Sequence, residues 1–310
     1  MSAAAGRVRL VLPATSANLG PGFDAAGLAM TMHLTVEAEP AGKTSISATG
    51  RDAAQCGKLE GNLIVETYEA VLKAESVDVV PLALTVRNEI PLGKGCGSSA
   101  AALLAGVALA NHFGGLGWSR DEVLREASVR EGHPDNVAAC WLGGLVLSAM
   151  ETAENGGVDV RAVSIQPAKD WKLLVVTQAE PLATTAARGL LPESYSKADA
   201  VFNVQRVALL TAAFAGGCDG LLKTAMQDRI HQPYRAKVCP LLPALEGLAG
   251  RDGVLGVALS GAGPSVLMVL AEEADVEKVK RLVAERTGGI AGVETILCGV
   301  EAQPASVEVV

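Results

Sequence analysis

The sequence predicts an α+β fold in two halves, and three observations lead to this expectation. Stretches with a period of two, such as residues 28–38, alternate with stretches of helical period, such as residues 275–286. A polar segment ending in Gly-Gly, residues 151–157, separates the halves. Hydrophobic residues make up 49% of the 310 residues but aromatic residues only 3%, so the core must be built from Ala, Val and Leu. We therefore expect an N-terminal domain over 1–157 and a C-terminal domain over 158–310.

The N-terminal half begins with strands. Residues 7–12 predict a first strand, and residues 13–24, PATSANLGPGFD, predict a loop rich in turn residues. The alternation over 28–38 predicts a half-buried strand, with 43–48 as its antiparallel partner. His33 falls on the polar face of this strand, and we interpret it as a solvated histidine.

Helices and strands then alternate. The elements expected in the first half are helix 62–73, strand 82–87, a helix from about Ser98, a helix opened by the capping box of Ser119 and Glu122, and strand 143–150. Those expected in the second half are strand 172–177, helices 199–215 and 219–228, strands 255–260 and 265–270 joined by a tight turn, and helix 275–286.

Composition disfavours several classes of protein. The net charge is −8, which argues against nucleic acid or an anionic membrane as the main partner. The 6 cysteines and 4 histidines lack zinc-site spacing, so we expect reduced cysteines in a cytoplasmic protein. Residues 1–6 lack the features of an export signal, and the apolar stretches are too short or too broken to span a bilayer.

The stretch PLGKGCGSSAA, which begins at Pro91, places glycine-rich backbone directly before a helix. Glycines allow successive N–H groups to point into one concavity, and a helix starting at about Ser98 adds its free first-turn N–H groups. Such an arrangement binds an anion, usually phosphate, and Ser98 and Ser99 add hydroxyls for phosphate or Mg²⁺. The spacing matches neither a Walker loop nor a dinucleotide fingerprint, since Lys94 precedes the last glycine. The alternative is a connection that merely lets the helix pack closely on a strand.

Two further loops combine glycine with small polar residues. Residues 13–24 carry Asn18 and Asp24, and SGAGPS, residues 260–265, lies between two apolar strands. Each loop alone is explained by ordinary turn chemistry. Taken together and in this order, SANLGPGFD, PLGKGCGSSAA and SGAGPS resemble the three motifs of the GHMP kinase superfamily. One departure is Cys96, which stands where the family usually has leucine.

The resemblance implies a fold and an activity. An N-terminal domain similar to a ribosomal protein and a ferredoxin-like C-terminal domain would hold the active site in the cleft between them. SANLGPGFD with EGHPDN (131–136) and TTAAR (184–188) is most similar to members that transfer the γ-phosphate of ATP to L-homoserine, a step toward threonine. Mg²⁺ as cofactor and a homodimer are also implied. A superfamily kinase for mevalonate or shikimate, or a non-catalytic binding protein on this fold, are the alternatives.

The resemblance also assigns residues to ATP and Mg²⁺. Asn62 matches the position that meets the adenine base. Ser99 and Glu131 match the Mg²⁺ ligands, and a hard cation takes such oxygen donors. The segment after Glu131 is shorter than in some members. The expected phosphate-loop residues are Pro91, Gly93, Lys94, Gly95, Cys96, Gly97, Ser98, Ser99 and Ala100.

Homoserine is a zwitterion with a side-chain hydroxyl, so its site needs a cation, an acceptor and an open path to the γ-phosphate. Arginine binds a carboxylate bidentately, and the resemblance gives this role to Arg188 and Arg235, although either alone could be a surface arginine. Asp24 is the natural ammonium acceptor. The expected substrate-binding residues are Asn18, Asp24, Asn136, Arg188, Arg235 and Gly261.

Some superfamily members use an aspartate as catalytic base, and Asn136 stands at its position. An amide cannot take a proton, so we expect direct attack of the hydroxyl, with its proton passing to phosphate or water. Thr184 would help to neutralise charge. His133 lies in a polar cluster on a Pro-constrained turn, and helix termination alone would leave it without a role. The expected catalytic residues are His133, Asn136, Thr184 and Arg188.

Overall fold

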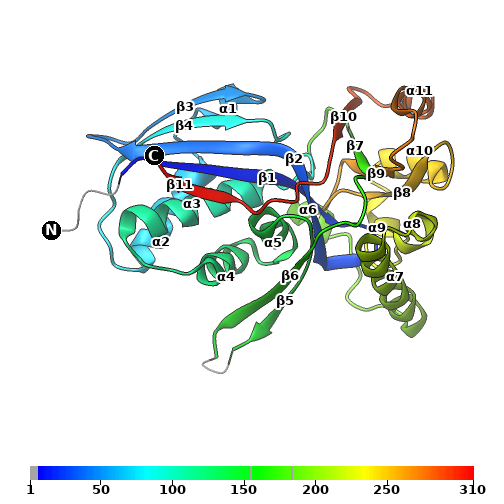
Figure 1. Ribbon diagram of the computed structural model, residues 1–310, viewed down its shortest axis with the longest axis horizontal. Coiled ribbons are helices and arrows are strands. Elements are labelled where there is room, and N and C mark those ends of the chain that lie inside the picture. Colours follow the sequence, from blue (N-terminus) through cyan, green and yellow to red (C-terminus); the bar gives the residue numbers. More distant parts are fainter. Residues whose placement is uncertain (1–5, 154–155, 183) are drawn as a thin grey trace.

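The computed structural model describes residues 6–153, 156–182 and 184–310, which form two groups of elements around two β-sheets (Figure 1). Residues 1–5, which contribute to the expectation about an export signal, lie outside the described residues. In the described ranges, no helix has the length and apolar character needed to cross a membrane.

The first sheet has seven strands in the described residues, in the order β11-β1-β2-β4-β3, with β5 paired to β2 and β6 to β5. Figure 1 shows helices α2 to α5 along one face of it. Its strands are β1 (Val8–Asn18), β2 (Gly22–Pro40), β3 (Ser45–Gly50), β4 (Leu82–Asn88), β5 (Leu145–Thr152), β6 (Val158–Ile165) and β11 (Ser306–Val309). The accompanying helices are α1 (Ala53–Cys56), α2 (Leu63–Ala74), α3 (Ser98–Gly114), α4 (Arg120–Glu131) and α5 (Asp135–Leu142).

The second sheet has four strands, in the order β10-β7-β9-β8. Leu173 and Val175 of β7 join the larger buried cluster, whereas Leu174 and Val176 join a second one, because successive side chains of a strand point to opposite faces. The strands are β7 (Lys172–Thr177), β8 (Val254–Leu259), β9 (Val266–Leu270) and β10 (Glu294–Cys298). The helices are α6 (Thr184–Arg188), α7 (Lys197–Gly216), α8 (Asp219–Ala225), α9 (Gln232–Arg235), α10 (Leu241–Leu245), the 3₁₀ helix Glu246–Leu248 and α11 (Val276–Thr287).

Two of the sequence expectations for the first sheet are wrong. Residues 13–18 are not loop but the second half of β1, which pairs with β2 and changes register after Pro13 and after Ala17. Bulges accommodate the proline and the small polar residues within a strand. Residues 43–48 do not pair with β2; β3 pairs with β4 in parallel, because β1 and β4 already occupy both edges of β2.

The polar segment 151–157 lies at the tip of the β5–β6 hairpin, with residues 154–155 outside the described part. Strand β6, which the sequence did not predict, pairs with β5 along its whole length, so the chain leaves the first sheet after Ile165 and not at residue 157. Strand β11 later returns beside β1. The division of the chain into domains 1–157 and 158–310 stays a proposal.

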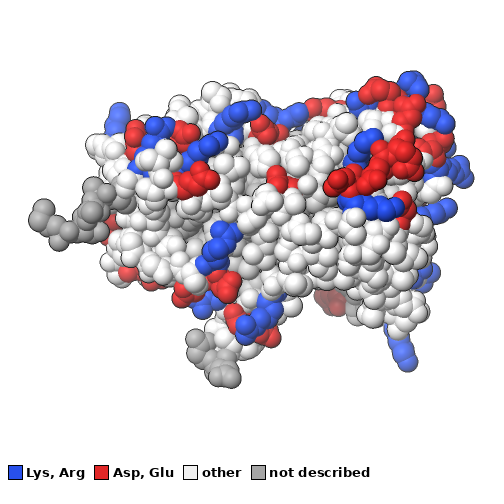
Figure 2. Space-filling model, viewed as in Figure 1, with Lys and Arg blue, Asp and Glu red and all other residues white. Residues whose placement is uncertain are grey.

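Charged side chains on the face shown in Figure 2 lie in mixed groups. Around α11, Lys278 pairs with Asp252 at 2.7 Å and Lys280 with Glu277 at 2.8 Å. Exposed pairs of this kind contribute about 0–1 kcal/mol each to stability. Their interspersed signs give this face no strong field of one sign.

Candidate active site

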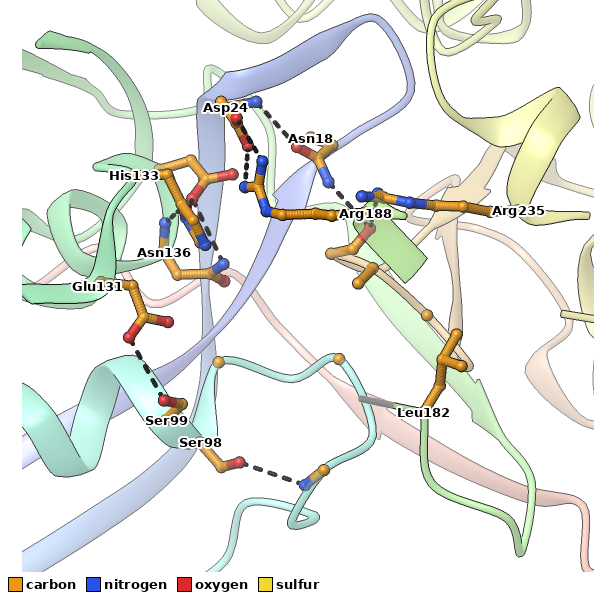
Figure 3. Close-up of a pocket in the computed structure, with 17 residues that line it drawn as sticks. Asn18, Asp24, Ser98, Ser99, Glu131, His133, Asn136, Leu182, Arg188 and Arg235 are labelled. Carbon is orange, nitrogen blue, oxygen red and sulfur yellow. Dashed lines mark hydrogen bonds and ion pairs between the residues drawn. The ribbon is translucent and has the colours of Figure 1, made fainter. Parts of the chain in front are cut away.

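The three glycine-containing motifs meet at one cavity between the two groups of elements (Figure 3). Asn18 Nδ2 donates to the Gly261 carbonyl at 2.9 Å, and Ser260 Oγ donates to the Gly95 carbonyl at 2.6 Å. About 610 Å³ of empty space lies within the cavity and its opening to solvent. Its lining residues are Asn18, Asp24, Gly93, Gly95, Gly97, Ser98, Ser99, Glu131, His133, Asp135, Asn136, Leu182, Arg188, Arg235, Gly261, Ala262 and Gly263.

Glycine is required in the loop before α3. Gly97 has φ 71°, and a Cβ there would collide with the Thr15 hydroxyl; a Cβ on Gly95, at φ 75°, would collide with the Ser260 carbonyl. Gly97 is also the N-cap of α3 and offers no side chain to the first turn. The N–H groups of that turn therefore have no side-chain cap, and Gly97, Ser98 and Ser99 line the cavity, as an anion site requires.

Only part of the expected phosphate loop lines this cavity: Gly93, Gly95, Gly97, Ser98 and Ser99 do, and Pro91, Lys94, Cys96 and Ala100 do not. The Lys94 ammonium donates to the carbonyl of Gln178 at 2.7 Å and to that of Ala179, beyond the end of β7. Cys96 is buried, which raises the pKa of its thiol to about 12.

A second cavity adjoins the first and shares Gly93, Ser98 and Ser99 with it. Its other lining residues are largely apolar, and Asn62 lies among them. Asn62 is the N-cap of α2: its amide oxygen accepts from the Ile64 N–H at 3.1 Å, while its nitrogen donates to the carbonyls of Cys56 and Lys58, each at 3.0 Å. Its polar atoms are therefore engaged locally, and it contributes to the wall of the cavity.

The two expected metal ligands lie together at the start of α3 and the end of α4. Ser99 Oγ donates to a Glu131 carboxylate oxygen at 3.4 Å. Burial raises the pKa of Glu131, against the opposing effects of His133 and the Ser99 hydroxyl. A divalent cation would offset this cost of burying a carboxylate, so the donor set suits a hard metal ion.

His133 and Asn136 are oriented by Asp135 and Thr15, neither of which was expected among the site residues. His133 Nδ1 lies 2.7 Å from Asp135 Oδ1. Burial lowers the His133 pKa, but this hydrogen bond and the negative charges of Asp135 and Glu131 together outweigh burial, so the pKa is raised. Thr15 Oγ1 donates to Asn136 Oδ1 at 2.7 Å, and the Asn136 amide nitrogen faces Asp135 at 3.5 Å. This pairing fixes which way the Asn136 amide points.

The two arginines have different partners. Arg188 binds Asp24 bidentately, at 2.9 and 2.6 Å, and this hydrogen bonding raises the Arg188 pKa. Arg235 is only 1% exposed, donates to the Gly261 carbonyl at 3.3 Å, and lacks a carboxylate partner in the described part of the chain. Its Nε has no hydrogen bond there, and burial lowers its pKa. A buried guanidinium of this kind favours an anionic ligand.

Most of the expected substrate and metal residues are thus brought together at the cavity, whereas Asn62 and four phosphate-loop residues do not line it. Asp24 is not free but paired with Arg188 in this structure. Thr184 is the first residue of α6, and its side chain lies outside the described part. Thr15 was missed although it belongs to the first motif, because those residues were interpreted as a loop. In the structure Thr15 is buried on β1, and a buried hydroxyl there indicates a polar partner.

Comparison with known proteins agrees with this geometry. Residues 62–144 match the GHMP kinases N terminal domain model and residues 210–287 the GHMP kinases C terminal model. The chain is 46% identical to the homoserine kinase of Solibacter usitatus over 302 residues, 97% of each chain. The homoserine kinase structure from Cytophaga hutchinsonii superposes with a TM-score of 0.78 at 26% identity, covering 99% of both chains. The L. major mevalonate kinase structure, in complex with R-mevalonate, has a TM-score of 0.68 at 18% identity over 96% of both chains, which shows the shared fold alone. The expected two-domain fold is confirmed, and the chain belongs to the homoserine kinase family of the GHMP kinases.

Proposed function

We propose that this protein transfers the γ-phosphate of ATP to the hydroxyl of L-homoserine, giving O-phospho-L-homoserine for threonine biosynthesis. The observation that carries the proposal is the buried, carboxylate-free Arg235 beside the Arg188–Asp24 pair, among the described residues of a cavity that also contains the glycine loop. These residues provide partners for both charges of a zwitterion, together with a phosphate site, in the same cavity.

In this proposal, ATP binds across the two adjoining cavities. The largely apolar second cavity would take the adenine base, with Asn62 in its wall. The N–H groups of the glycine loop and the first turn of α3 would take the phosphates, with Ser98 and Ser99 beside them. Because Lys94 is bound to backbone carbonyls, we assign it to holding the loop against the segment that follows β7 and not to the phosphates.

Ser99 and Glu131 are the residues that would hold Mg²⁺. Their oxygens lie together, and Glu131 is a partly buried carboxylate without a basic partner within ion-pair distance among the described residues. When bound, Mg²⁺ would neutralise phosphate charge.

For the substrate, we propose that Asp24 binds the ammonium group while Arg188 and Arg235 bind the carboxylate. Asp24 and Arg188 satisfy each other without substrate, so the zwitterion would replace one ion pair by two of the same kind. Asn18, whose amide is bonded to the Gly261 carbonyl and to the Asp24 N–H, would keep Asp24 in position. Asn18 and Asp24 have φ of 70° and 56°, and such strain is typical of ligand sites.

The chemical step needs no protein base in this proposal. The Thr15 hydroxyl donates a hydrogen bond to the Asn136 amide oxygen. Asn136 therefore presents its NH₂ group to the substrate and orients it as a hydrogen-bond donor. The hydroxyl oxygen attacks the γ-phosphorus, the bond to ADP breaks, and the proton passes to phosphate or water. In its protonated form, His133 would add positive charge near the transferred group, since it lines the cavity. Thr184 is assigned a supporting role as a hydroxyl donor to the phosphate.

A coupled ADP-release assay with Mg-ATP tests the function. The acceptors are L-homoserine, D-homoserine, L-serine, mevalonate, shikimate and galactose. Turnover with L-homoserine far above the rest is expected. Turnover with mevalonate or shikimate alone would keep the phosphate loop and refute the substrate assignments, since mevalonate has no ammonium group for Asp24. Binding of ATP without turnover of any acceptor would favour a non-catalytic binding protein.

A homodimer and a cytoplasmic location also remain proposals. Val201 and Val204 on α7 are 45% and 66% exposed, and association would cover such apolar surface. Light scattering after size exclusion measures the assembly, and fractionation of cells measures the location.

A further inference from the structure

His231 lies directly behind Arg235 and has no assigned role in the reaction. Its side chain is 0% exposed and stacks on the Phe23 ring, with centroids 5.4 Å apart. Its Nε2 lies 2.8 Å from the Gly20 carbonyl oxygen, and its Nδ1 lies 3.2 Å from Arg235 Nη1. The imidazole therefore connects the turn after β1 to the guanidinium that faces the cavity.

The partners of the ring determine where its proton lies. A guanidinium only donates hydrogen bonds and a carbonyl oxygen only accepts them. Nδ1 must therefore hold a lone pair toward Arg235, and Nε2 must carry the proton that it donates to Gly20. His231 is a neutral imidazole in this arrangement, and its burial, which lowers the pKa, favours the same state.

The nearest carboxylate does not alter this assignment. Asp228 Oδ2 lies 3.6 Å from His231 Nε2. Both Asp228 oxygens already accept shorter hydrogen bonds, from the N–H groups of Ile230, His231 and Gln232 and from Asn203 Nδ2, at 2.6–2.9 Å. Asp228 thus fixes the turn that carries His231 and leaves the ring neutral.

A neutral acceptor has a particular consequence for Arg235. A carboxylate at the same place would form an ion pair with the guanidinium and compete with a carboxylate ligand. The imidazole lone pair of His231 fixes the direction of one N–H group of Arg235, and the full positive charge of the guanidinium stays available for a carboxylate ligand. The Nε group of Arg235 has no hydrogen-bond partner among the described residues, since the bonds to His231 and Gly261 both involve Nη1.

We propose that His231 is a positioning residue that aims Arg235 at the carboxylate of the substrate as a neutral Nε2–H imidazole. The proposal rests on the proposed function for the identity of that substrate. It assigns His231 to recognition of the carboxylate alone, and not to ATP binding or phosphoryl transfer.

The test compares His231→Leu, which cannot accept a hydrogen bond, with His231→Gln, whose amide oxygen can. Each is assayed with L-homoserine and with 3-aminopropan-1-ol, which has the same hydroxyl and ammonium groups but no carboxylate. His231→Leu is expected to raise the KM for L-homoserine about 10- to 100-fold, the scale of one hydrogen bond to a charged group. The kcat, the KM for ATP and kcat/KM for 3-aminopropan-1-ol should stay within about threefold of the wild type. His231→Gln should recover a large part of the affinity for L-homoserine.

An equal loss with both acceptors, or an unchanged KM for L-homoserine, would overturn the proposal, because a merely structural role does not discriminate between them. The wild-type protein in the same assay separates this from the proposed function: no turnover of L-homoserine fails the function itself. Long-range ¹H–¹⁵N spectra of the wild-type histidines test the tautomer without any activity. An Nε2–H ring for His231 from about pH 6 to about pH 8 supports the proposal, and a doubly protonated or Nδ1–H ring contradicts it.

Discussion

Replacing Arg235 by methionine should weaken catalysis and at the same time leave the fold as stable or more stable. Methionine has a similar length and no charge. The guanidinium is 1% exposed and makes only long hydrogen bonds, 3.3 Å to the Gly261 carbonyl and 3.2 Å to His231 Nδ1. The Gly261 carbonyl keeps its 2.9 Å bond from Asn18, so the substitution leaves it satisfied.

The expected magnitudes follow from these contacts. Burying a charge without a counter-ion is costly, and replacing buried ionic groups by apolar ones is often neutral or stabilising by about 1–4 kcal/mol. The lost bond to His231 costs about 1 kcal/mol. We therefore expect the free energy of unfolding to change by about 0 to +3 kcal/mol, and Tm to rise by up to about 6 °C. Loss of two charge-assisted bonds to the substrate, at about 1.5–3 kcal/mol each, should lower kcat/KM for L-homoserine by about 10²–10⁴.

The assay is ADP release at varied L-homoserine, together with thermal unfolding of the same preparations. Arg206→Met is a matched control, because Arg206 stacks on Phe202 away from the cavity and should affect kcat/KM little. A Tm that falls by several degrees together with an unchanged KM would refute the reasoning, since it would make Arg235 a structural residue.

Four further predictions follow from the same site. Gly97→Val should lower the free energy of unfolding in urea by more than about 2 kcal/mol, because its φ of 71° and the contact with Thr15 exclude a side chain. Glu131→Gln should raise the Mg²⁺ concentration for half-maximal activity about 10- to 100-fold, measured by metal titration at saturating ATP. Asn136→Ala should lower kcat about 10²-fold with little change in KM, because only orientation is lost. Protonated His133 should stabilise the folded state, fully so at pH values below its ordinary pKa of 6.5. This stabilisation should be lost as the pH rises through the raised pKa of His133 in the folded state, as measured by urea unfolding at a series of pH values.

Each of these has an outcome that contradicts it. A stable Gly97→Val protein would mean that the loop before α3 tolerates a side chain. An unchanged metal requirement in Glu131→Gln would place the cation elsewhere. A loss of several thousandfold in Asn136→Ala would mean that this amide does more than orient. His133→Asn should remove the pH dependence above 6.5, and an unaltered dependence would assign it to another group.

Local features were predictable because their causes lie within a few residues. The capping box at the start of α4 is present, with Ser119 accepting from the Glu122 N–H and Glu122 bonding back to Ser119. The helix predicted over 62–73 is α2, which begins after its N-cap Asn62. The glycine-rich loop expected before α3 is present, and its three glycines have positive φ angles, which only residues without a Cβ adopt at low cost.

The sequence by itself determined the periodic strands and helices, the glycine turns and the set of polar residues near them, since these depend on side-chain spacing and on the φ angles that each residue allows. Tertiary structure alone decided which of these features meet. Strand β3 joined β4 because β2 had no free edge, and Thr15 reached Asn136, 121 residues away, because β1 extends beneath α5. Such contacts depend on which edges and faces remain unoccupied once the sheet has formed, and no local pattern records that choice.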